Sequence, residues 1–396
     1  MLSHKDEFQE QLLAQMDMTK EYEDKEVLSL IDDMILNESR QNPMTLDEKD
    51  RLRRELFDSI RKLDILSELL ENDEITEIMV NGFQNIFIEK EGKIQKYGHQ
   101  FSSPERLDDV IQQIVGQCNR VVNEQTPIVD ARLDNGSRVS IVLKPVALNG
   151  PILSIRRFPD SPITMLDLIQ NNSITRDAAR FLQKLVISGY SIMIGGGTSS
   201  GKTTFLNALS NFIPSSERVV TIEDNAELQI QNVDNLVRLE CRAGTMNESL
   251  TITMDDLIKS ALRMRPNRVI VGEIRGPEAR SYISSLNLGH DGSMATAHAN
   301  SAAEMITRLE TMVLMGMELP LFVVRRQIAS GIDILIHLGR DKDGHRQVEE
   351  ITEVLDLQKE DVRLQTLYDR KDGELKRRND LRNTQKLERS GYETKI

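Results

Sequence analysis

Residues 191–204 read SIMIGGGTSSGKTT. An apolar run at 191–194 leads into a loop at 196–203 that matches the pattern G-x-x-x-x-G-K-[ST] at every fixed position, and a helical pattern follows at 205–212. Small residues let successive backbone N–H groups close around a polyanion, and the helix adds the positive end of its dipole. Because strand, loop and helix occur in the order that such a site needs, we predict a nucleotide phosphate site rather than a chance match.

The residues of this loop have distinct expected roles. We expect Lys202 to reach the β and γ phosphates and Thr203 to bind Mg²⁺ through its hydroxyl. The other predicted nucleotide contacts belong to the same stretch and are Gly196, Gly197, Thr198, Ser199, Ser200, Gly201 and Thr204.

Two further apolar runs end in carboxylates. Residues 219–222 are followed by Glu223, and residues 269–272 are followed by Glu273. Ligands of a mostly parallel α/β sheet lie outside the carboxyl ends of its strands, so both side chains should face the phosphates. We predict that Glu273 is the general base toward water, and that Glu223 is catalytic and holds Mg²⁺ through water. A solvated strand end is the alternative for each.

Two histidines flank a short apolar strand in the segment GHDGSMATAHAN, residues 289–300. His290 and His298 are eight residues apart, whereas a zinc pair on one helix face needs a spacing nearer three or four. His298 could be a core residue bonded to a carbonyl, or a neutral imidazole that donates to the γ-phosphate or to the catalytic carboxylate. Its place at a strand end beside the loop favours the functional role, so we count it as catalytic.

The rest of the chain divides by its hydrophobic period and composition. Proline and polar residues at 159–162 suit a short linker between two compact domains. The predicted segments are an acidic helical N-terminal segment at 1–72, a small α+β domain at 73–158, the linker at 159–164, an α/β domain at 165–369 and a basic, flexible tail at 370–396.

Composition excludes several classes of function. The 396 residues carry a formal net charge of −13 and 4% aromatic residues, which argues against nucleic-acid binding. No apolar stretch reaches the roughly 20 residues of a membrane span, and the first residues do not resemble a signal peptide, so we expect a cytoplasmic protein. The two cysteines, Cys118 and Cys241, form no metal-binding pattern, and we expect both to be reduced.

The motifs together resemble a known family. The loop GGGTSSGKTT and the segments TIEDNAEL, LRMRPNRVIVGEIRGPEA and GHDGSMATAHANS, in this order and at these spacings, are similar to those of the CpaF/TadA family of type II/type IV secretion and pilus-assembly ATPases. Upstream, EITEIMVNG, DARLDNGSRVSI and LSIRRF resemble the family's sensor-like N-terminal domain. The resemblance covers roughly residues 73–357.

The resemblance implies a RecA-like P-loop ATPase domain in a homo-hexameric ring, with ATP and Mg²⁺ held between the two domains. Such an enzyme works at the inner face of the cell membrane and powers pilus assembly or protein secretion through an inner-membrane platform protein. Arginines of the family's N-terminal domain reach the phosphates, and a solvated arginine is the alternative for each. The matching arginines are Arg132, Arg138, Arg156 and Arg157, with Arg263 and Arg265 as further candidates.

Two other functions stay open at this point. A nucleic-acid motor could use the same RecA-like core, but it would need a basic groove and stacking aromatic residues. The 10 Phe and 6 Tyr residues are scattered along an acidic chain, which disfavours that alternative. A monomeric small-molecule kinase would instead transfer phosphate to an acceptor, with activity that does not depend on protein concentration.

Overall fold

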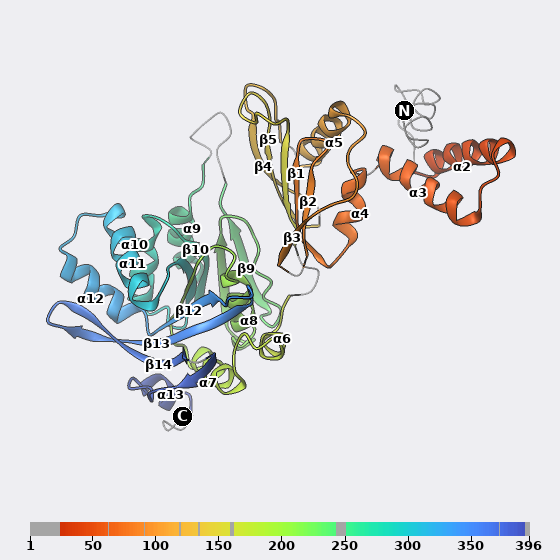
Figure 1. The fold of residues 1–396 in the computed structure, drawn as a ribbon. Coiled ribbons are helices and arrows are strands. Elements are labelled where there is room, and N and C mark those ends of the chain that lie inside the picture. The colour runs from red at the N-terminus through yellow and green to blue at the C-terminus, as the bar shows by residue number, and fades with distance from the viewer. Residues whose placement is uncertain are drawn as a thin grey trace. The chain divides into compact units, whose positions relative to one another are not determined.

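The computed structural model describes residues 24–61, 63–90, 92–118, 120–133, 135–158, 162–242, 251–371 and 373–392. The chain divides between Asp160 and Ser161 into two compact units, here called the first and the second unit (Figure 1). Residues 1–23 of the predicted N-terminal segment and residues 159–161 of the predicted linker lie outside the described residues. None of the helices in the described part of the chain is long and apolar enough to cross a membrane.

The described part of the first unit begins with two helices that pack on each other, α2 (Asp24–Gln41) and α3 (Leu46–Arg61). The backbone N–H of Thr45 donates to the carboxylate of Glu48 at 2.8 Å, and the N–H of Glu48 donates back to the Thr45 hydroxyl at 3.3 Å. This capping box starts α3. The apolar stripes of the two helices meet in a small core formed by Val27, Ile31, Met34, Ile35 and Leu56.

An antiparallel sheet follows these two helices in the first unit, and α4 (Ile65–Glu71) and α5 (Pro104–Gln117) pack against it. In the described residues the sheet has six strands in the order β3-β2-β1-β6-β5-β4. Apolar residues alternate along the strands, so one face is buried against the helices. The strands are β1 (Ile75–Asn81), β2 (Ile86–Lys90), β3 (Lys93–Lys96), β4 (Ile128–Arg132), β5 (Arg138–Val142) and β6 (Ile152–Arg156).

A larger mixed sheet forms the centre of the second unit. Its described part has nine strands in the order β15-β14-β13-β12-β7-β11-β10-β8-β9. Neighbouring strands are parallel from β12 to β9 and antiparallel from β12 to β15. The strands are β7 (Ile192–Gly196), β8 (Arg218–Glu223), β9 (Asn235–Glu240), β10 (Arg268–Ile274), β11 (Met294–His298), β12 (Ile334–Arg340), β13 (Arg346–Gln358), β14 (Asp361–Lys371) and β15 (Glu374–Arg377).

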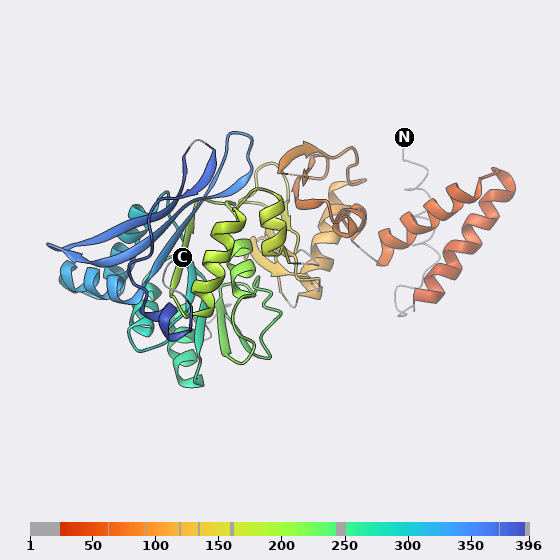
Figure 2. The ribbon, with the colours of Figure 1, turned by 90° about the horizontal axis from the view of Figure 1, so that it is seen from below.

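Helices cover both faces of this sheet. Ile192 and Ile194 of β7 belong to one apolar core and Met193 to another, as expected for a strand buried on both faces. This three-layer arrangement confirms the predicted α/β fold, and Figure 2 shows the yellow-green helices across one face. The helices of this unit are α6 (Met165–Gln170), α7 (Arg176–Ile187), α8 (Lys202–Ser210), α9 (Met254–Ala261), α10 (Glu278–Leu286), α11 (Ala302–Gly316), α12 (Leu321–Gly331) and α13 (Gln385–Arg389).

The C-terminal segment differs from the prediction of a flexible, solvated tail at 370–396. Residues 373–392 instead form β15 and α13, which pack against the second unit. Their apolar side chains join the core that contains Ile192, and these are Leu375, Leu381 and Leu387. One basic residue of the segment is anchored by two carboxylates: Lys386 Nζ lies 2.7 Å from Asp333 Oδ2 and 2.9 Å from Asp291 Oδ1. Residues 393–396 lie outside the description.

Candidate active site

The phosphate loop, residues 196–203, has a backbone shape that depends on its small residues. Gly201 has a φ of 91° and Ser199 a φ of 56°. Residues other than glycine rarely adopt this left-handed region of the backbone. A Cβ atom on Gly196 would lie 2.3 Å from Ser200 Oγ, so no side chain fits there. At Gly197 the nearest described atoms are more than 4 Å from such a Cβ. The loop is therefore tight on one side and open on the other.

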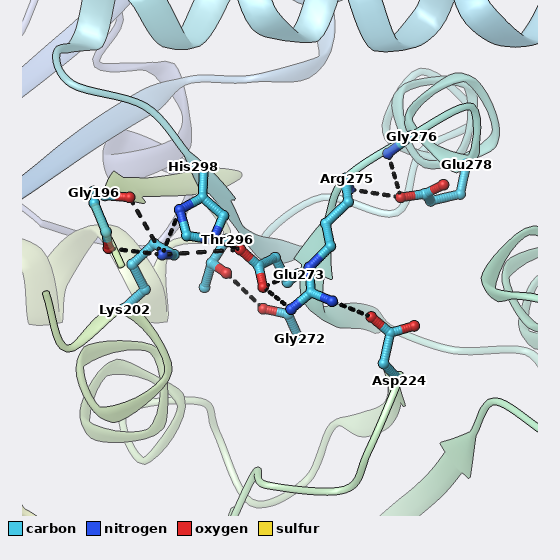
Figure 3. A network of polar contacts seen from close by, with 11 residues as sticks. Gly196, Lys202, Asp224, Gly272, Glu273, Arg275, Gly276, Glu278, Thr296 and His298 are labelled. Atoms are coloured by element: carbon cyan, nitrogen blue, oxygen red, sulfur yellow. Dashed lines mark hydrogen bonds and ion pairs between the residues drawn. The ribbon is translucent and has the colours of Figure 1, made fainter. Parts of the chain in front are cut away.

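Lys202, the first residue of α8, is buried and lies against the loop (Figure 3). Its Nζ donates to the carbonyl oxygens of Gly196 at 3.2 Å and Gly197 at 3.1 Å. The same atom lies 3.4 Å from His298 Nδ1 and 3.8 Å from Glu273 Oε1. The structure thus brings together three of the residues that the sequence singled out, from α8, β10 and β11.

His298 connects Lys202 with Glu273. Its Nε2 lies 2.8 Å from Glu273 Oε1. An ammonium group can only donate, so Nδ1 accepts from Lys202 and the proton lies on Nε2, the nitrogen that faces Glu273 at ion-pair distance. Burial lowers the pKa of His298; Glu273 opposes this shift, whereas Lys202 adds to it. The lowered pKa favours the uncharged imidazole at neutral pH, and the catalytic role of His298 stays a prediction.

Arg275 holds the other oxygen of Glu273. Its Nε donates to Glu273 Oε2 at 2.8 Å, Nη2 donates to the same oxygen, and Nη1 lies 3.2 Å from Asp224 Oδ2. Neither Arg275 nor Asp224 is among the site residues predicted from the sequence. The signal for Arg275 was present in the spacing, because Arg275 directly follows β10 and comes two residues after Glu273, the separation at which extended residues point to the same side.

Glu223 is placed differently from Glu273. Its side chain is 2% exposed, and Oε1 accepts the backbone N–H groups of Glu227 and Leu228, both at 2.8 Å. Its hydrogen bonds in the described part of the chain thus go to the loop after β8, and Oε2 is buried without a hydrogen-bond partner there. Burial raises the pKa of Glu223 to about 7, although the two N–H groups oppose the shift.

The remaining predicted residues fall into two groups. Thr203 and Thr204 lie in the first turn of α8 beside Lys202, and both are half-buried. Arg263 and Arg265 are exposed between α9 and β10.

The four arginines predicted to reach the phosphates belong to the first unit. Arg132, Arg138 and Arg156 are directly paired across β4, β5 and β6, so they form a row on one side of the sheet. Arg157 is used differently: it donates to the carbonyl of Ile75 at 3.1 Å and pairs with Asp73 at 3.0 Å. Their role toward phosphate stays a prediction.

Comparison with known proteins points to one family. The model of the family described as "Type II/IV secretion system protein" matches residues 60–387. An uncharacterized protein of Methanocaldococcus jannaschii is 38% identical over 274 residues, which span 67% of this chain but only 38% of that relative. The type IV secretion system protein PtlH of Bordetella pertussis is 30% identical over 302 residues, covering 70% of this chain and 89% of PtlH.

A solved structure adds evidence on the fold. The X-ray structure of the Legionella pneumophila ATPase DotB is similar with a TM-score of 0.53 and 20% sequence identity, and the match covers 72% of this chain and 78% of DotB. At this identity the likeness supports the α/β fold alone.

Proposed function

The chain belongs to the type II/IV secretion system protein family, and from this premise we propose that it is an ATP-hydrolysing motor that powers pilus assembly or protein secretion. The observation that carries the proposal is the convergence of Lys202, Glu273 and His298 beside the phosphate loop. A cation, a carboxylate and a neutral imidazole at a triphosphate site are the groups that phosphate binding and water activation need.

The residues present fit Mg²⁺ and ATP. The loop is closed by Gly196 and open above Gly197, which lets a phosphate approach its backbone N–H groups. Ser200 Oγ and Glu223 Oε2 are buried and have no hydrogen-bond partner among the described residues. Because buried polar atoms are normally hydrogen-bonded, a bound ligand or its water would supply the partners that these two atoms lack. Thr203 would hold Mg²⁺ directly and Glu223 through water. The metal ion would neutralise charge on the phosphate oxygens.

We assign the chemistry to Glu273. Its carboxylate would orient a water molecule and accept a proton from it as the water oxygen attacks the γ-phosphorus. Arg275 fixes Oε2, whereas Oε1, which faces Lys202 and His298 and has no hydrogen-bond partner among the described residues, is left to accept from the water. Lys202 gives its hydrogen bonds to two loop carbonyls in this structure, and phosphate oxygens would replace these partners.

Arginines of the first unit would add positive charge to the phosphates. Like charges directly opposite one another on neighbouring strands repel, so the row of Arg132, Arg138 and Arg156 suits an anion. A guanidinium group can pair two phosphate oxygens, and such a group contributes about 10³ to 10⁵ in rate in other phosphoryl-transfer enzymes. Arg157 is the weaker candidate because its side chain already pairs with Asp73.

The finer assignments rest on the motifs that resemble the CpaF/TadA ATPases. We propose a homo-hexamer at the cytoplasmic face of the membrane, with an inner-membrane platform protein as its partner. The name of PtlH, a type IV secretion system protein, agrees with an export role. The net charge of −13 disfavours a nucleic-acid substrate.

Hydrolysis by the purified full chain tests the proposal. We expect Mg²⁺-dependent release of phosphate from ATP, with specific activity that rises with protein concentration as rings form, and light scattering should show the hexamer with a non-hydrolysable ATP analogue. Strong stimulation by DNA or RNA would instead support a nucleic-acid motor. Transfer of phosphate to a small acceptor, independent of protein concentration, would support a kinase.

A further inference from the structure

A hairpin from the antiparallel part of the large sheet reaches the phosphate loop. Arg340 ends β12, Arg346 begins β13, and the two residues are directly paired across the hairpin. The turn between them is held by Asp341, whose Oδ1 accepts the N–H groups of Asp343 at 2.9 Å and His345 at 2.8 Å. This ordered turn fixes the points from which the two arginines extend.

Both arginines donate to one carbonyl oxygen of the phosphate loop, that of Ser199. Arg340 contributes Nη2 at 2.7 Å and Nε at 3.2 Å, and Arg346 contributes Nε at 3.0 Å. The Cδ of Arg346 also lies 3.4 Å from the position that a Cβ on Gly201 would take. The hairpin therefore contacts the loop at the two residues that have a positive φ.

These contacts have a physical reason. A residue other than glycine keeps a left-handed backbone only where its surroundings hold it, and Ser199 is such a residue at a φ of 56°. Two guanidinium groups directly opposite one another on a hairpin repel, and a shared carbonyl oxygen offsets that repulsion. The direction of the Ser199 carbonyl sets the orientation of the N–H in the same peptide plane, that of Ser200, which donates to the Gly197 carbonyl at 3.4 Å and so helps to shape the phosphate loop.

We propose that Arg340 and Arg346 are positioning residues of the nucleotide site, an inference that rests on the proposed function. They hold the Ser199 carbonyl and so keep the loop in its phosphate-binding shape before the nucleotide arrives. Without the two arginines the loop relaxes. Nucleotide binding is then weaker, because part of its free energy is used to order the loop. Glu273 and His298 lie on other strands, so their chemistry is preserved once nucleotide is bound.

The hairpin itself does not depend on these two side chains for its place. The backbone oxygen of Arg346 accepts the Ser173 hydroxyl at 2.7 Å, and the N–H of Val348 donates to the Ser173 carbonyl at 2.8 Å. Val348 is also fully buried in the core. Removal of either guanidinium group should therefore leave the fold intact.

Steady-state kinetics of the full chain test the inference. The variants are Arg340→Ala, Arg346→Ala and the double variant, with Arg363→Ala as the matched control because Arg363 is exposed on the neighbouring strand β14. We expect KM for ATP, and Kd for Mg-ADP by calorimetry, to rise about tenfold in each single variant and further in the double variant. We expect kcat to stay within about threefold, because the catalytic groups are unchanged. Arg363→Ala should match the wild type.

The outcomes separate this inference from the proposed function. If the double variant has the KM of the wild type, or loses kcat at unchanged KM, the positioning role is wrong, while hydrolysis by the wild type and its loss in Lys202→Ala leave the proposed function standing. If the wild type neither binds nor hydrolyses ATP, both are wrong. Thermal unfolding of each variant should show a melting temperature close to that of the wild type. A large drop would mean that the arginines act through the fold and would overturn the positioning role.

Discussion

The parallel and antiparallel halves of the large sheet use their polar residues in different ways. In the parallel half, β7, β10 and β11 end at one edge, where the loop, Glu273 and His298 meet. In the antiparallel half, buried polar groups bind other segments of the chain: Glu353 accepts the N–H groups of Arg382 and Asn383. Only parallel strands gather their carboxyl ends at one edge. We therefore expect substitutions of the residues that converge on the loop to impair chemistry, and substitutions in the antiparallel half to impair stability, except at Arg340 and Arg346, whose hairpin reaches the phosphate loop.

Lys202→Ala should give the largest effect. It removes the cation that converges on the loop with Glu273 and His298, and we expect a loss of about 10³-fold or more in kcat/KM for ATP, together with weaker nucleotide binding. A phosphate-release assay measures it. Lys376→Ala, an exposed lysine on β15 in the antiparallel half, is the control and should keep full activity. Equal losses in both variants would erase the contrast between the halves.

Glu273→Gln should give the second largest effect on activity. The amide keeps the size of the side chain but cannot accept the proton of water, so we expect turnover at least ~10²-fold slower with ATP still bound. Single-turnover kinetics and equilibrium binding separate the two effects. Glu374→Gln, at an exposed position on β15, is the matched control. Normal hydrolysis by Glu273→Gln would show that another group activates the water.

Glu223→Gln tests the buried carboxyl group of the parallel half. The pKa of Glu223 is about 7 in the folded chain and 4.5 in the reference state, so between these values the folded protein binds more protons than the unfolded one. Its contribution to stability is full below pH 4.5 and is lost as the pH rises through about 7. The loss amounts to about 3 kcal/mol, which Gln should abolish.

Urea denaturation from pH 5 to pH 8 measures this dependence. We expect the free energy of unfolding of the wild type to fall with pH relative to that of Glu223→Gln. Glu360→Gln, in the exposed turn between β13 and β14, should follow the wild type. Parallel curves for the wild type and Glu223→Gln would mean that Glu223 is ionised throughout this range.

Lys386→Ala should affect stability alone. Lys386 pairs with Asp333 and Asp291, and its loss leaves the half-buried Asp333 carboxylate with one partner fewer. We expect a decrease of about 2 kcal/mol in the free energy of unfolding, with unchanged kcat. Lys371→Ala, which removes an exposed lysine paired with Asp369, should cost less than ~0.5 kcal/mol. A fall in kcat for the folded Lys386→Ala variant would contradict the division between the halves.

Much of the parallel half could be predicted from the sequence. The G-x-x-x-x-G-K-[ST] pattern predicts which residues form the phosphate loop. Continuous apolar runs identify β7, β8, β10 and β11 as buried strands. The meeting of Glu273 and His298 follows because parallel strands share one edge. The hydrogen bonds of Glu223 could not be predicted, because they depend on how the chain turns after β8.

The antiparallel half was harder to predict beyond its strands. Arg340 and Arg346 bond to a backbone oxygen 141 and 147 residues away, and no side-chain pattern marks such a partner. The C-terminal leucines lie in a strand, a loop and a short helix, so they match neither the period of a helix nor that of a strand. The basic charge of this segment was visible in the sequence, whereas the carboxylates that pair with Lys386, those of Asp291 and Asp333, are distant from it in the sequence.

The half-protonated carboxyl group of Glu223 should be detectable by isothermal titration calorimetry. Near neutral pH about half of the molecules carry a proton on this group. A cation arriving nearby favours the ionised form, so the displaced proton passes to the buffer. The apparent enthalpy of titrating Mg-nucleotide into the protein should therefore differ between phosphate and Tris solutions, in proportion to the ionisation enthalpies of these two buffers.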